Sequence, residues 1–409
     1  MKKTALLIAL IAHCILGNAQ HRPLPYVVLV SFDGFRSDYV EQFDLTNFKK
    51  FVRDGAAGPL IPSFPSKTFP NHYTIVTGLY PGNHGLVDNQ FYDPAMKTFY
   101  SLHKREAVAN SSFYGGVPLW RLARQNNMRS ASFFWVGSEM REDHLRPDYY
   151  FPYDEKIPNI KRVDQIIEWL QMPEGERPHF ITLYFSSPDS EAHSFGPFAE
   201  QTRQKTLELD SLLGKLMREI DEINLPVNVI LVSDHGLREL VQSDSTYIFL
   251  EELISPRQKD VIFVNGGTQT HLYCSAHVAD SLETVLKSKS KGFTVMRRKG
   301  FPKRWHYDHD RSGEILLLAD ADKVFIAGDR AQFMRRIKHG KPFGVHGYDP
   351  SEVSDMNGIF YAKGPNIRSG VILAPFANVH IYPLIANILN LPFSRIDGNA
   401  KVLRPIYVE

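Results

Sequence analysis

The stretch from residue 26 to residue 34, YVVLVSFDG, decides the fold class, because the same form occurs twice more in the chain. A short apolar run ends in turn residues here, and the segments 179–189 (HFITLYFSSPD) and 228–236 (NVILVSDHG) repeat this arrangement. Such runs are typical of buried parallel strands. Helical patterns lie between them, most clearly over 198–223, where leucine and isoleucine recur at helical spacing. The sequence therefore predicts an α/β fold, with a central, mostly parallel sheet covered by helices on both faces.

Two further regions complete the predicted organisation. A last helix fits residues 378–391, with Pro383 near its first turn. Residues 250–345 hold short β-like pieces such as DVIFVNGG, GFTVMRR and EILLLAD, together with basic runs. We therefore expect residues 21–409 to fold as a single domain, with 250–345 as a smaller α+β lobe inserted before His346.

Residues 1–20, MKKTALLIALIAHCILGNAQ, predict a secretory signal peptide that is cleaved after Gln20. The apolar stretch is too short for a strong membrane span, and the bulky His13 before Cys14 argues against a lipoprotein anchor. The composition of the segment looks bacterial, so the expected location is the periplasm or the cell exterior. The mature chain then keeps only Cys274, which excludes an internal disulfide.

The overall composition is that of a globular protein without a basic surface. Apolar residues make up 43% of the chain and charged residues 22%. The formal net charge of +2 at pH 7 gives no indication of a nucleic-acid polymer as partner. The oligomeric state stays open at this point.

Acidic residues follow all three predicted strands. Asp33 ends the first, Asp189 follows the second, and the pair Asp234 and His235 ends the third. In open α/β sheets, ligands bind beyond the carboxyl ends of the strands. We therefore expect these four side chains to converge at one edge of the sheet.

Two histidines extend this set. His193 lies four residues after Asp189, on the same face of a helical turn, and His346 stands between glycines in GVHGYDP. Aspartate, imidazole and hydroxyl donors without cysteine suit a catalytic zinc site with an open position. Several imidazoles make manganese or magnesium less favoured.

Thr68 lies in the segment 65–78, PSKTFPNHYTIVTG, just before a predicted short helix. A lone threonine in this position is usually an N-cap. Beside a metal site it fits a nucleophile, because bound zinc lowers the pKa of a coordinated water from its much higher bulk value to about 7. A comparable effect on threonine makes a separate base unnecessary, so we interpret His72 as a packed side chain. The helix would aim free N–H groups at an anionic group on Thr68.

Together, these motifs closely resemble those of the nucleotide pyrophosphatase/phosphodiesterase family of the alkaline phosphatase superfamily. VSFDGFR, PSFPSKTFPNHYTIVTGLYPGNHGLVDNQFYDP, ERPHFITLYFSSPDSEAHSFGP, VSDHG and VHGYDP occur in the family's order and spacing, over nearly the whole mature chain. The resemblance implies an alkaline-phosphatase-like mixed sheet between helices, carrying two zinc ions. The implied ligands are Asp189, His193 and His346 for one ion, and Asp33, Asp234 and His235, with the Thr68 oxygen, for the other.

The resemblance also implies how a substrate is held and cut. Asn89, in VDNQF, falls at the position that binds a non-bridging phosphate oxygen. Thr68 would attack phosphorus to form a phosphothreonine, which water then hydrolyses. The expected substrate is a dinucleoside polyphosphate, a nucleoside triphosphate or a nucleotide diester, cut to release a nucleoside 5′-monophosphate. The family's nucleoside pocket matches five aromatic and apolar residues: Phe69, Leu102, Trp135, Tyr153 and Tyr184.

The residues alone leave more than one function open. Some relatives cleave choline-bearing phospholipids instead, using aromatic or acidic cages for the quaternary amine. A phosphomonoesterase of the same superfamily is a second possibility, whereas a sulfatase would need a Cys/Ser-x-Pro-x-Arg motif, which is missing. Outside enzymes, a secreted metal-binding module would need neither Thr68 nor Asn89.

A second cluster of metal-ligand residue types occurs in the segment 304–311, RWHYDHDR. A similar stretch occurs in the family before the last histidine ligand, outside the zinc pair. We therefore expect a structural or solvated role for its four members, His306, Asp308, His309 and Asp310.

Overall fold

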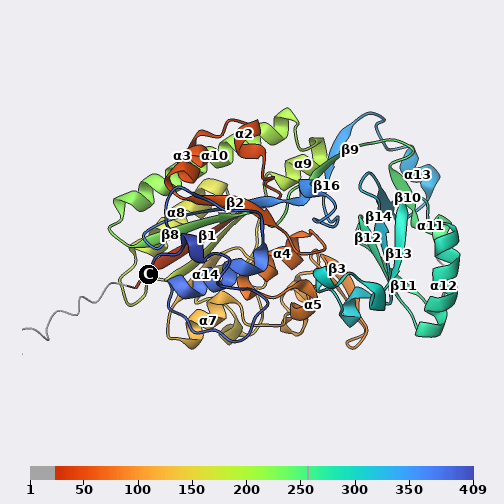
Figure 1. Cartoon of the computed structure of the whole chain (residues 1–409), viewed down its shortest axis with the longest axis horizontal. Coiled ribbons are helices and arrows are strands. Elements are labelled where there is room, and N and C mark those ends of the chain that lie inside the picture. The colour runs from red at the N-terminus through yellow and green to blue at the C-terminus, as the bar shows by residue number, and fades with distance from the viewer. Residues whose placement is uncertain (1–23, 256–257) are drawn as a thin grey trace, which may run out of the picture.

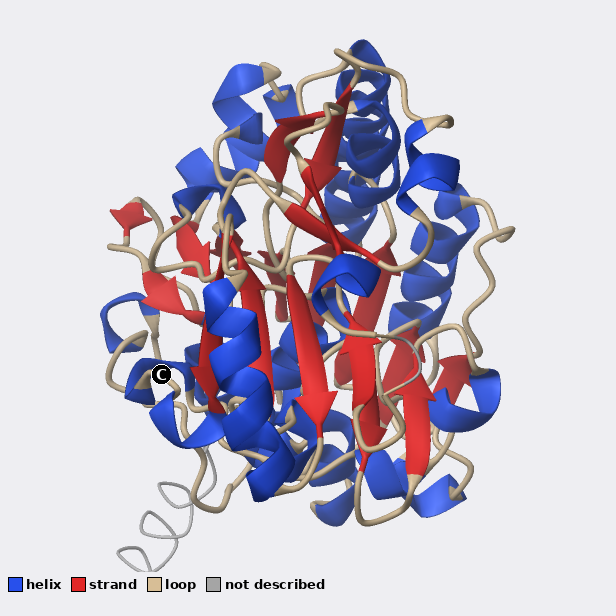
Figure 2. Ribbon diagram, turned by 90° about the vertical axis from the view of Figure 1, so that its right-hand side faces the viewer, coloured by secondary structure: helices blue, strands red, loops and turns tan. Residues whose placement is uncertain are grey.

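The computed structural model describes residues 24–255 and 258–409. Its largest element is a nine-stranded sheet (Figures 1 and 2). Eight of the strands have the order β18-β2-β17-β8-β1-β7-β5-β6, and the ninth, β19, also pairs with β2. The strands are β1 (Tyr26–Phe32), β2 (Ala56–Ile61), β5 (Ser130–Phe133), β6 (Tyr149–Phe151), β7 (Phe180–Phe185), β8 (Val227–Val232), β17 (Gly358–Lys363), β18 (Val371–Ile372) and β19 (Phe376–Ala377).

The sheet is mostly parallel, as the sequence predicts. The central strand β1 pairs in parallel with β7 on one side and β8 on the other, with Phe32 beside Phe185 and Ser31 beside Val232. Strand β17 is antiparallel to both of its neighbours, β2 and β8, which makes the sheet mixed. All three predicted strands are confirmed, and each stops before its acidic residue. The carboxyl ends of β7, β1 and β8 therefore lie at one edge of the sheet.

Helices cover both faces of this sheet (Figure 1). Alternate residues of β1 face opposite layers, because successive strand side chains point to opposite faces. Val28 and Val30 pack in a core with helices α3, α8 and α10, whereas Val27 and Leu29 pack in a core with α4, α7 and α14. These helices are α3 (Thr46–Asp54), α4 (Thr68–Thr77), α7 (Leu119–Gln125), α8 (Asn159–Gln171), α10 (Glu200–Glu222) and α14 (Ile381–Ile388).

The two predicted helices are present, with shorter bounds. The pattern over 198–223 forms α10, and the last helix begins with a 3₁₀ turn (Asn378–His380) before α14. Pro383 lies in the first turn of α14, as expected, and the helix ends at Ile388 rather than at residue 391. The remaining helices are α2 (Tyr39–Gln42), α5 (Pro81–His84), α6 (Arg105–Val108) and α9 (Asp189–Phe195) in the sheet region, and α11 (Leu250–Leu253), α12 (Ala276–Ser288) and α13 (Arg330–Met334) further along the chain.

A smaller α+β lobe precedes His346, to the right of the main sheet in Figure 1. Its four-stranded antiparallel sheet has the order β11-β12-β14-β13, and α12 packs against it. The strand pair β10–β15 contacts β12 of this sheet, whereas in the pair β9–β16 strand β16 contacts α9 of the main body. The hairpin β3–β4 of the main body lies beside β11. The bounds are β3 (Gln90–Asp93), β4 (Thr98–Ser101), β9 (Arg238–Val241), β10 (Tyr247–Phe249), β11 (Ile262–Asn265), β12 (Gln269–Tyr273), β13 (Phe293–Arg297), β14 (Ile315–Ala319), β15 (Val324–Ile326) and β16 (Pro342–Val345). The division into one domain with an inserted lobe stays a prediction.

The predicted signal peptide, with Cys14, lies outside the described residues. Among the helices of residues 24–255 and 258–409, none has the length and apolar character needed to cross a membrane. Cys274 is a free, half-buried thiol.

Candidate active site

The acidic residues that follow β1, β7 and β8 come together, because these three strands are neighbours in the sheet. Backbone contacts lock the turns to one another: Gly34 donates its N–H to Asp234 Oδ1 at 3.1 Å, and Asp189 donates its N–H to the carbonyl of Asp33 at 3.1 Å. Gly34 has a φ of 66° and lies so close to Asp189 that an added Cβ would approach its side chain to 2.8 Å. A glycine is therefore required where the first turn meets the second.

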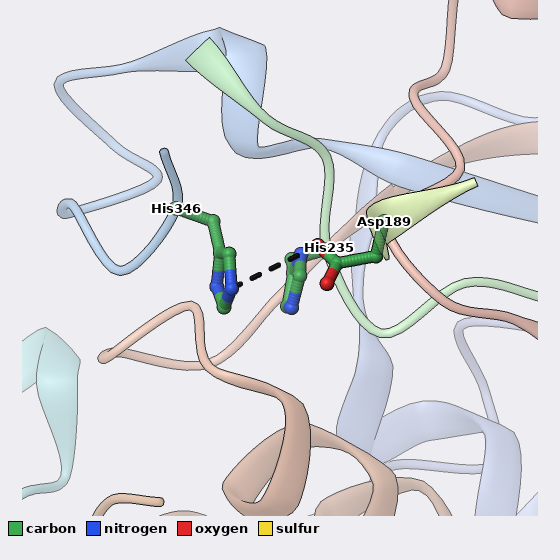
Figure 3. Close-up of side chains that lie close together, drawn as sticks. All are labelled: Asp189, His235 and His346. Atoms are coloured by element: carbon green, nitrogen blue, oxygen red, sulfur yellow. Dashed lines mark ion pairs between the residues drawn. The ribbon is translucent and has the colours of Figure 1, made fainter. Parts of the chain in front are cut away.

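The gathered side chains form two overlapping groups of potential metal ligands. We use the name strand-end cluster for these two groups together with His193, that is, for Asp33, Asp189, His193, Asp234, His235 and His346. Ligand atoms of Asp33, Asp234 and His235 lie within 4.8 Å of one another, as do those of Asp189, His235 and His346. His235 Nε2 lies 3.0 Å from Asp234 Oδ2. His346 Nε2 lies 3.8 Å from Asp189 Oδ1, and the rings of His235 and His346 stack with centroids 3.6 Å apart (Figure 3).

His193 lies at the edge of this cluster. Its Nε2 is 3.4 Å from Asp189 Oδ1, and its ring centroid is 5.0 Å from that of His346. The structure thus brings His193, Asp189 and His346 together, but the group of ligand atoms within 4.8 Å of one another contains His235 instead of His193, and His235 lies closer to His346 than His193 does. The division of the ligands between two ions stays a prediction.

The histidines of the cluster are oriented by the backbone. Nδ1 of His346 lies 2.8 Å from the carbonyl of Ser66, Nδ1 of His193 lies 2.8 Å from that of Gly344, and Nδ1 of His235 lies 3.0 Å from that of Gly236. A carbonyl only accepts, so each Nδ1 carries the hydrogen and each Nε2 keeps its lone pair for a metal ion.

The carboxylates of the cluster have oxygens that no neighbour satisfies. Among the described residues, Asp33 Oδ1, Asp189 Oδ1 and Asp234 Oδ2 are buried without a hydrogen-bond partner. Burial, followed by the charges of Asp234 and Asp189, raises the pKa of Asp33 well above its usual value. Burial alone would also raise the pKa of Asp234, but His235 and His72 lower it to about 2. A buried set of unpaired acceptors beside bare imidazole nitrogens fits bound cations.

Thr68 is the first residue of α4 and reaches the cluster from outside the sheet. Its Oγ1 lies 3.3 Å from His235 Nε2. Lys67 occupies the N-cap position without a side-chain capping bond. The expectation that the first helix N–H groups are free needs a correction, because Asn89 Oδ1 accepts the N–H of Phe69 at 2.9 Å. Since its oxygen is used in this way, Asn89 has its NH₂ group left for a ligand.

His72 is a packed side chain, as interpreted from the sequence. It is fully buried, with Nδ1 2.9 Å from the carbonyl of Thr68 and Nε2 2.8 Å from Ser31 Oγ. Both ring nitrogens are therefore engaged.

A cavity of about 470 Å³ opens over the cluster and Thr68. Tyr153 and Tyr184 line it and contact each other edge to face, with ring centroids 6.1 Å apart, and Tyr184 donates its hydroxyl to Asp33 Oδ2 at 2.6 Å. Trp135 lines the cavity but is 4% exposed and belongs mainly to the core. The lining includes all of the predicted substrate and catalytic residues, Thr68, Phe69, Asn89, Leu102, Trp135, Tyr153 and Tyr184, together with Asp33, Asp189, His193 and His346.

Sequence reasoning missed a charged pair in the wall of this cavity. Arg105 Nη2 lies 2.6 Å from Glu139 Oε2, and the other oxygen of Glu139 accepts the N–H of Tyr153 at 2.8 Å. Glu139 therefore positions one of the predicted aromatic side chains. No motif marks this link, because its three members come from separate segments of the chain.

In the part of the chain that the structure describes, the side chains of the 304–311 segment contact other parts of the protein and do not converge on a shared metal site. His306 stacks on Tyr80 with ring centroids 4.3 Å apart, and His309 Nδ1 accepts the N–H of Arg311 at 3.0 Å. Asp310 pairs with Arg298. Within the described residues, groups of three or more potential ligands occur in the strand-end cluster and not in this segment.

Comparison with known proteins adds independent evidence. The sequence model of the family described as type I phosphodiesterase/nucleotide pyrophosphatase matches residues 27–349. The chain is 31% identical over 402 residues to human ectonucleotide pyrophosphatase/phosphodiesterase family member 1, covering 94% of this chain and 42% of that protein. It is 33% identical over 380 residues to venom phosphodiesterase 2 of Crotalus adamanteus, covering 89% of this chain and 45% of that protein. The chain thus spans less than half the length of these two relatives.

A solved structure extends the similarity to three dimensions. Murine ectonucleotide pyrophosphatase/phosphodiesterase 5 superposes with a TM-score of 0.85 at 27% identity, covering 94% of this chain and 100% of that one. An inactive variant of the murine protein, in which one threonine is replaced by alanine, was solved in complex with AMP.

Proposed function

We propose, because the chain belongs to the type I phosphodiesterase/nucleotide pyrophosphatase family, that it hydrolyses phosphodiester or pyrophosphate bonds in small nucleotides and releases nucleoside 5′-monophosphates. The observation that carries this proposal is the placement of Thr68 and the unpartnered carboxylates at one end of an aromatic cavity. The threonine variant of the murine relative in complex with AMP supports both the nucleophile and the substrate class.

The donor set suits two zinc ions. We assign Asp189, His193 and His346 to one ion, and Asp33, Asp234 and His235, with the Thr68 oxygen, to the other. The unpartnered carboxylate oxygens and the bare imidazole nitrogens of this set are the groups that such ions require. When bound, zinc supplies a Lewis acid that lowers the pKa of a coordinated hydroxyl or water and neutralises charge on phosphoryl oxygens.

Thr68 acts as the nucleophile in a two-step displacement. Its Oγ1 forms a bond to phosphorus while the bond from phosphorus to the departing oxygen breaks, and the hydroxyl proton ends on the leaving group. A water molecule then attacks phosphorus, the bond to Oγ1 breaks, and the threonine hydroxyl is restored. The position at the start of α4 fixes Oγ1 beside His235, which serves positioning, the main requirement of phosphoryl transfer.

The remaining residues of the cavity hold the substrate. The NH₂ group of Asn89 donates to a non-bridging phosphoryl oxygen, since its oxygen is bound to the N–H of Phe69. A nucleoside base stacks against the aromatic side chains that line the cavity, which include Phe69, Tyr153 and Tyr184. Stacking contributes about 1–3 kcal/mol per base and tolerates different bases.

Choline-bearing phospholipids are a less favoured substrate class. A cage for a quaternary amine needs unpaired acidic or aromatic groups. Glu139 in the cavity is already paired with Arg105, whereas the aromatic side chains suit a planar base equally well. A phosphomonoesterase activity and a non-catalytic metal-binding role are two competing functions that enzyme assays distinguish from the proposed one.

The test is hydrolysis of p-nitrophenyl thymidine 5′-monophosphate compared with p-nitrophenyl phosphate, with and without a chelator. We expect strong diesterase activity, weak monoesterase activity and loss of both on chelation. Thr68→Ala should lower kcat by at least about 10⁴-fold, because it removes the hydroxyl that attacks phosphorus. Full turnover by Thr68→Ala would refute the assignment of the nucleophile, and a preference for the monoester would favour the monoesterase. Metal binding without turnover of either compound would favour the non-catalytic module.

We also propose that the protein acts in the periplasm or outside the cell, on the basis of residues 1–20. Expression of the full chain followed by N-terminal sequencing of the exported form tests this. A start at residue 21 supports the proposal, and an uncleaved chain retained in the cytoplasm contradicts it.

A further inference from the structure

Asn89 is held in place by its backbone as well as by its side chain. Its carbonyl accepts the N–H of Leu102 at 3.0 Å, and its own N–H is donated to Asp88 Oδ1 at 2.6 Å. Its side-chain oxygen accepts the N–H of Phe69, next to Thr68. The backbone of Asn89 is therefore held by the carboxylate of Asp88 as well as by the N–H of Leu102.

Asp88 is in turn bound by the inserted lobe. The carboxylate is fully buried, and its Oδ2 accepts Nε2–H of Gln269 at 2.6 Å and lies 3.0 Å from His271 Nε2. Gln269 and His271 are alternate residues of β12, so their side chains leave the strand on one face. Both are fully buried as well.

The partners of Asp88 are themselves fixed within the lobe. His271 Nδ1 lies 3.0 Å from the carbonyl of Ser312, so both ring nitrogens face oxygen atoms and the ring is held from two sides. Gln269 receives the hydroxyl of Thr268 on its oxygen, which turns its NH₂ group toward Asp88. The contact is tightly packed, because a Cβ at Gly266 would approach Asp88 Oδ2 to 2.7 Å and Gln269 Nε2 to 2.9 Å.

We infer that Asp88 is a positioning residue for Asn89, and that the inserted lobe sets the place of the Asn89 amide through Gln269 and His271. This inference rests on the proposed function, in which Asn89 binds a phosphoryl oxygen. A displacement of about 1 Å at a reacting group costs on the order of 100-fold in rate. A rigid, buried link from the lobe thus has a direct effect on turnover without contacting the substrate.

A double-mutant cycle on the full-length, zinc-loaded protein tests the inference. Asp88→Asn preserves the volume of the side chain but places an NH₂ group or a weaker acceptor against the donors of Gln269 and His271. We expect it to lower kcat for p-nitrophenyl thymidine 5′-monophosphate by about 10-fold or more, with a smaller change in KM. In an Asn89→Ala background the same substitution should change kcat by less than about 2-fold, because the residue it positions is gone.

Gln90→Ala is the matched control. Gln90 donates from Nε2 to the carbonyl of Asn265 at 2.7 Å, so it joins the same loop to the same lobe without involving Asp88. We expect it to change kcat by less than about 2-fold in both backgrounds. Gly266→Ala, which changes no charge, separates Asp88 from Gln269 and serves as a second disrupting variant in case Asp88→Asn does not fold.

An equal loss of kcat from Asp88→Asn in both backgrounds would overturn the inference, as would a kcat within about 2-fold of wild type accompanied only by a lower Tm. Failure of the proposed function is recognised separately, since the wild-type protein would then not hydrolyse the diester at all.

Discussion

Within residues 24–255 and 258–409, the strand-end cluster and the 304–311 segment both concentrate aspartate and histidine, and they differ in how their polar atoms are satisfied. In the strand-end cluster, the side chains of Asp33 and Asp234 are 4% and 0% exposed, and each has an oxygen without a hydrogen-bond partner. In the 304–311 segment, Asp308 and Asp310 are 84% and 76% exposed and lie near Arg298. Residue types alone therefore do not mark a metal site. Several buried carboxylates without partners, gathered beside imidazole nitrogens, fit such a site, because a bound cation removes the cost of burying their charges together.

The largest expected difference between the two regions is in activity. Asp234→Ala removes one carboxylate from a buried ligand group and should lower kcat/KM for the chromogenic diester by about 10³-fold or more, because the charge on the phosphoryl group is then less well neutralised. Asp308→Ala, in the 304–311 segment, should leave kcat/KM within about 2-fold of wild type. Equal effects of the two substitutions would abolish the distinction between the regions.

A second difference concerns the contribution of the 304–311 segment to the stability of the fold. Arg311, the last residue of the 304–311 segment, donates Nε–H to Asp93 Oδ2 at 2.6 Å in a buried ion pair. Arg311→Met leaves that carboxylate without its cation, and we expect the free energy of unfolding to fall by about 3 kcal/mol. Urea unfolding monitored by circular dichroism measures this. An unchanged unfolding midpoint would show that the pair contributes nothing.

The same ion pair predicts a dependence on pH. Although burial alone would raise the pKa of Asp93, the N–H of Met96 and the Arg311 guanidinium lower it below its usual value. A carboxyl group with a lowered pKa contributes stability above the unfolded pKa of about 3.9, and this contribution is lost as the pH falls further. The wild-type protein should therefore lose more stability between about pH 5 and pH 3 than Asp93→Asn does. Parallel unfolding curves for the two proteins over this range would contradict the prediction.

The smallest expected effect is on the free energy of unfolding, which aspartate-to-asparagine substitutions at Asp33 and at Asp93 should change in opposite directions. In the metal-free protein, Asp33→Asn removes a buried charge that Asp234 and Asp189 oppose, and it should raise the free energy of unfolding by about 1 kcal/mol. Asp93→Asn should lower it, because Arg311 loses a charged partner. Thermal unfolding in the presence of a chelator measures both. A destabilising Asp33→Asn would contradict the prediction and show that the hydrogen bond from Tyr184 to Asp33 Oδ2 outweighs the repulsion from Asp234 and Asp189.

Much of this arrangement follows from the sequence, because it depends on strands whose pattern is local. The apolar runs before Asp33, Asp189 and Asp234 each predict a strand, and adjacency in a parallel sheet then brings the three acids together. Thr68 and Asn89 are identifiable through the resemblance of their motifs. The bounds of the elements are less predictable, since helix ends depend on contacts with the rest of the fold.

Further parts of the site have no local signal. The links from Glu139 to Arg105 and from Asp88 to His271 join residues that are far apart in the sequence. Spacing also could not show that His235 lies within reach of both ligand groups, because the stacking of His235 on His346 depends on how the chain returns from the lobe.

The measurement that tests the account most directly is the zinc content of the protein after chelation, reloading and extensive dialysis. Elemental analysis should give about two zinc ions per chain for the wild type and for Asp308→Ala, and a clearly lower content for Asp234→Ala. A wild-type protein without bound zinc, or a content that Asp234→Ala leaves unchanged, would contradict the assignment of the strand-end cluster as a metal centre.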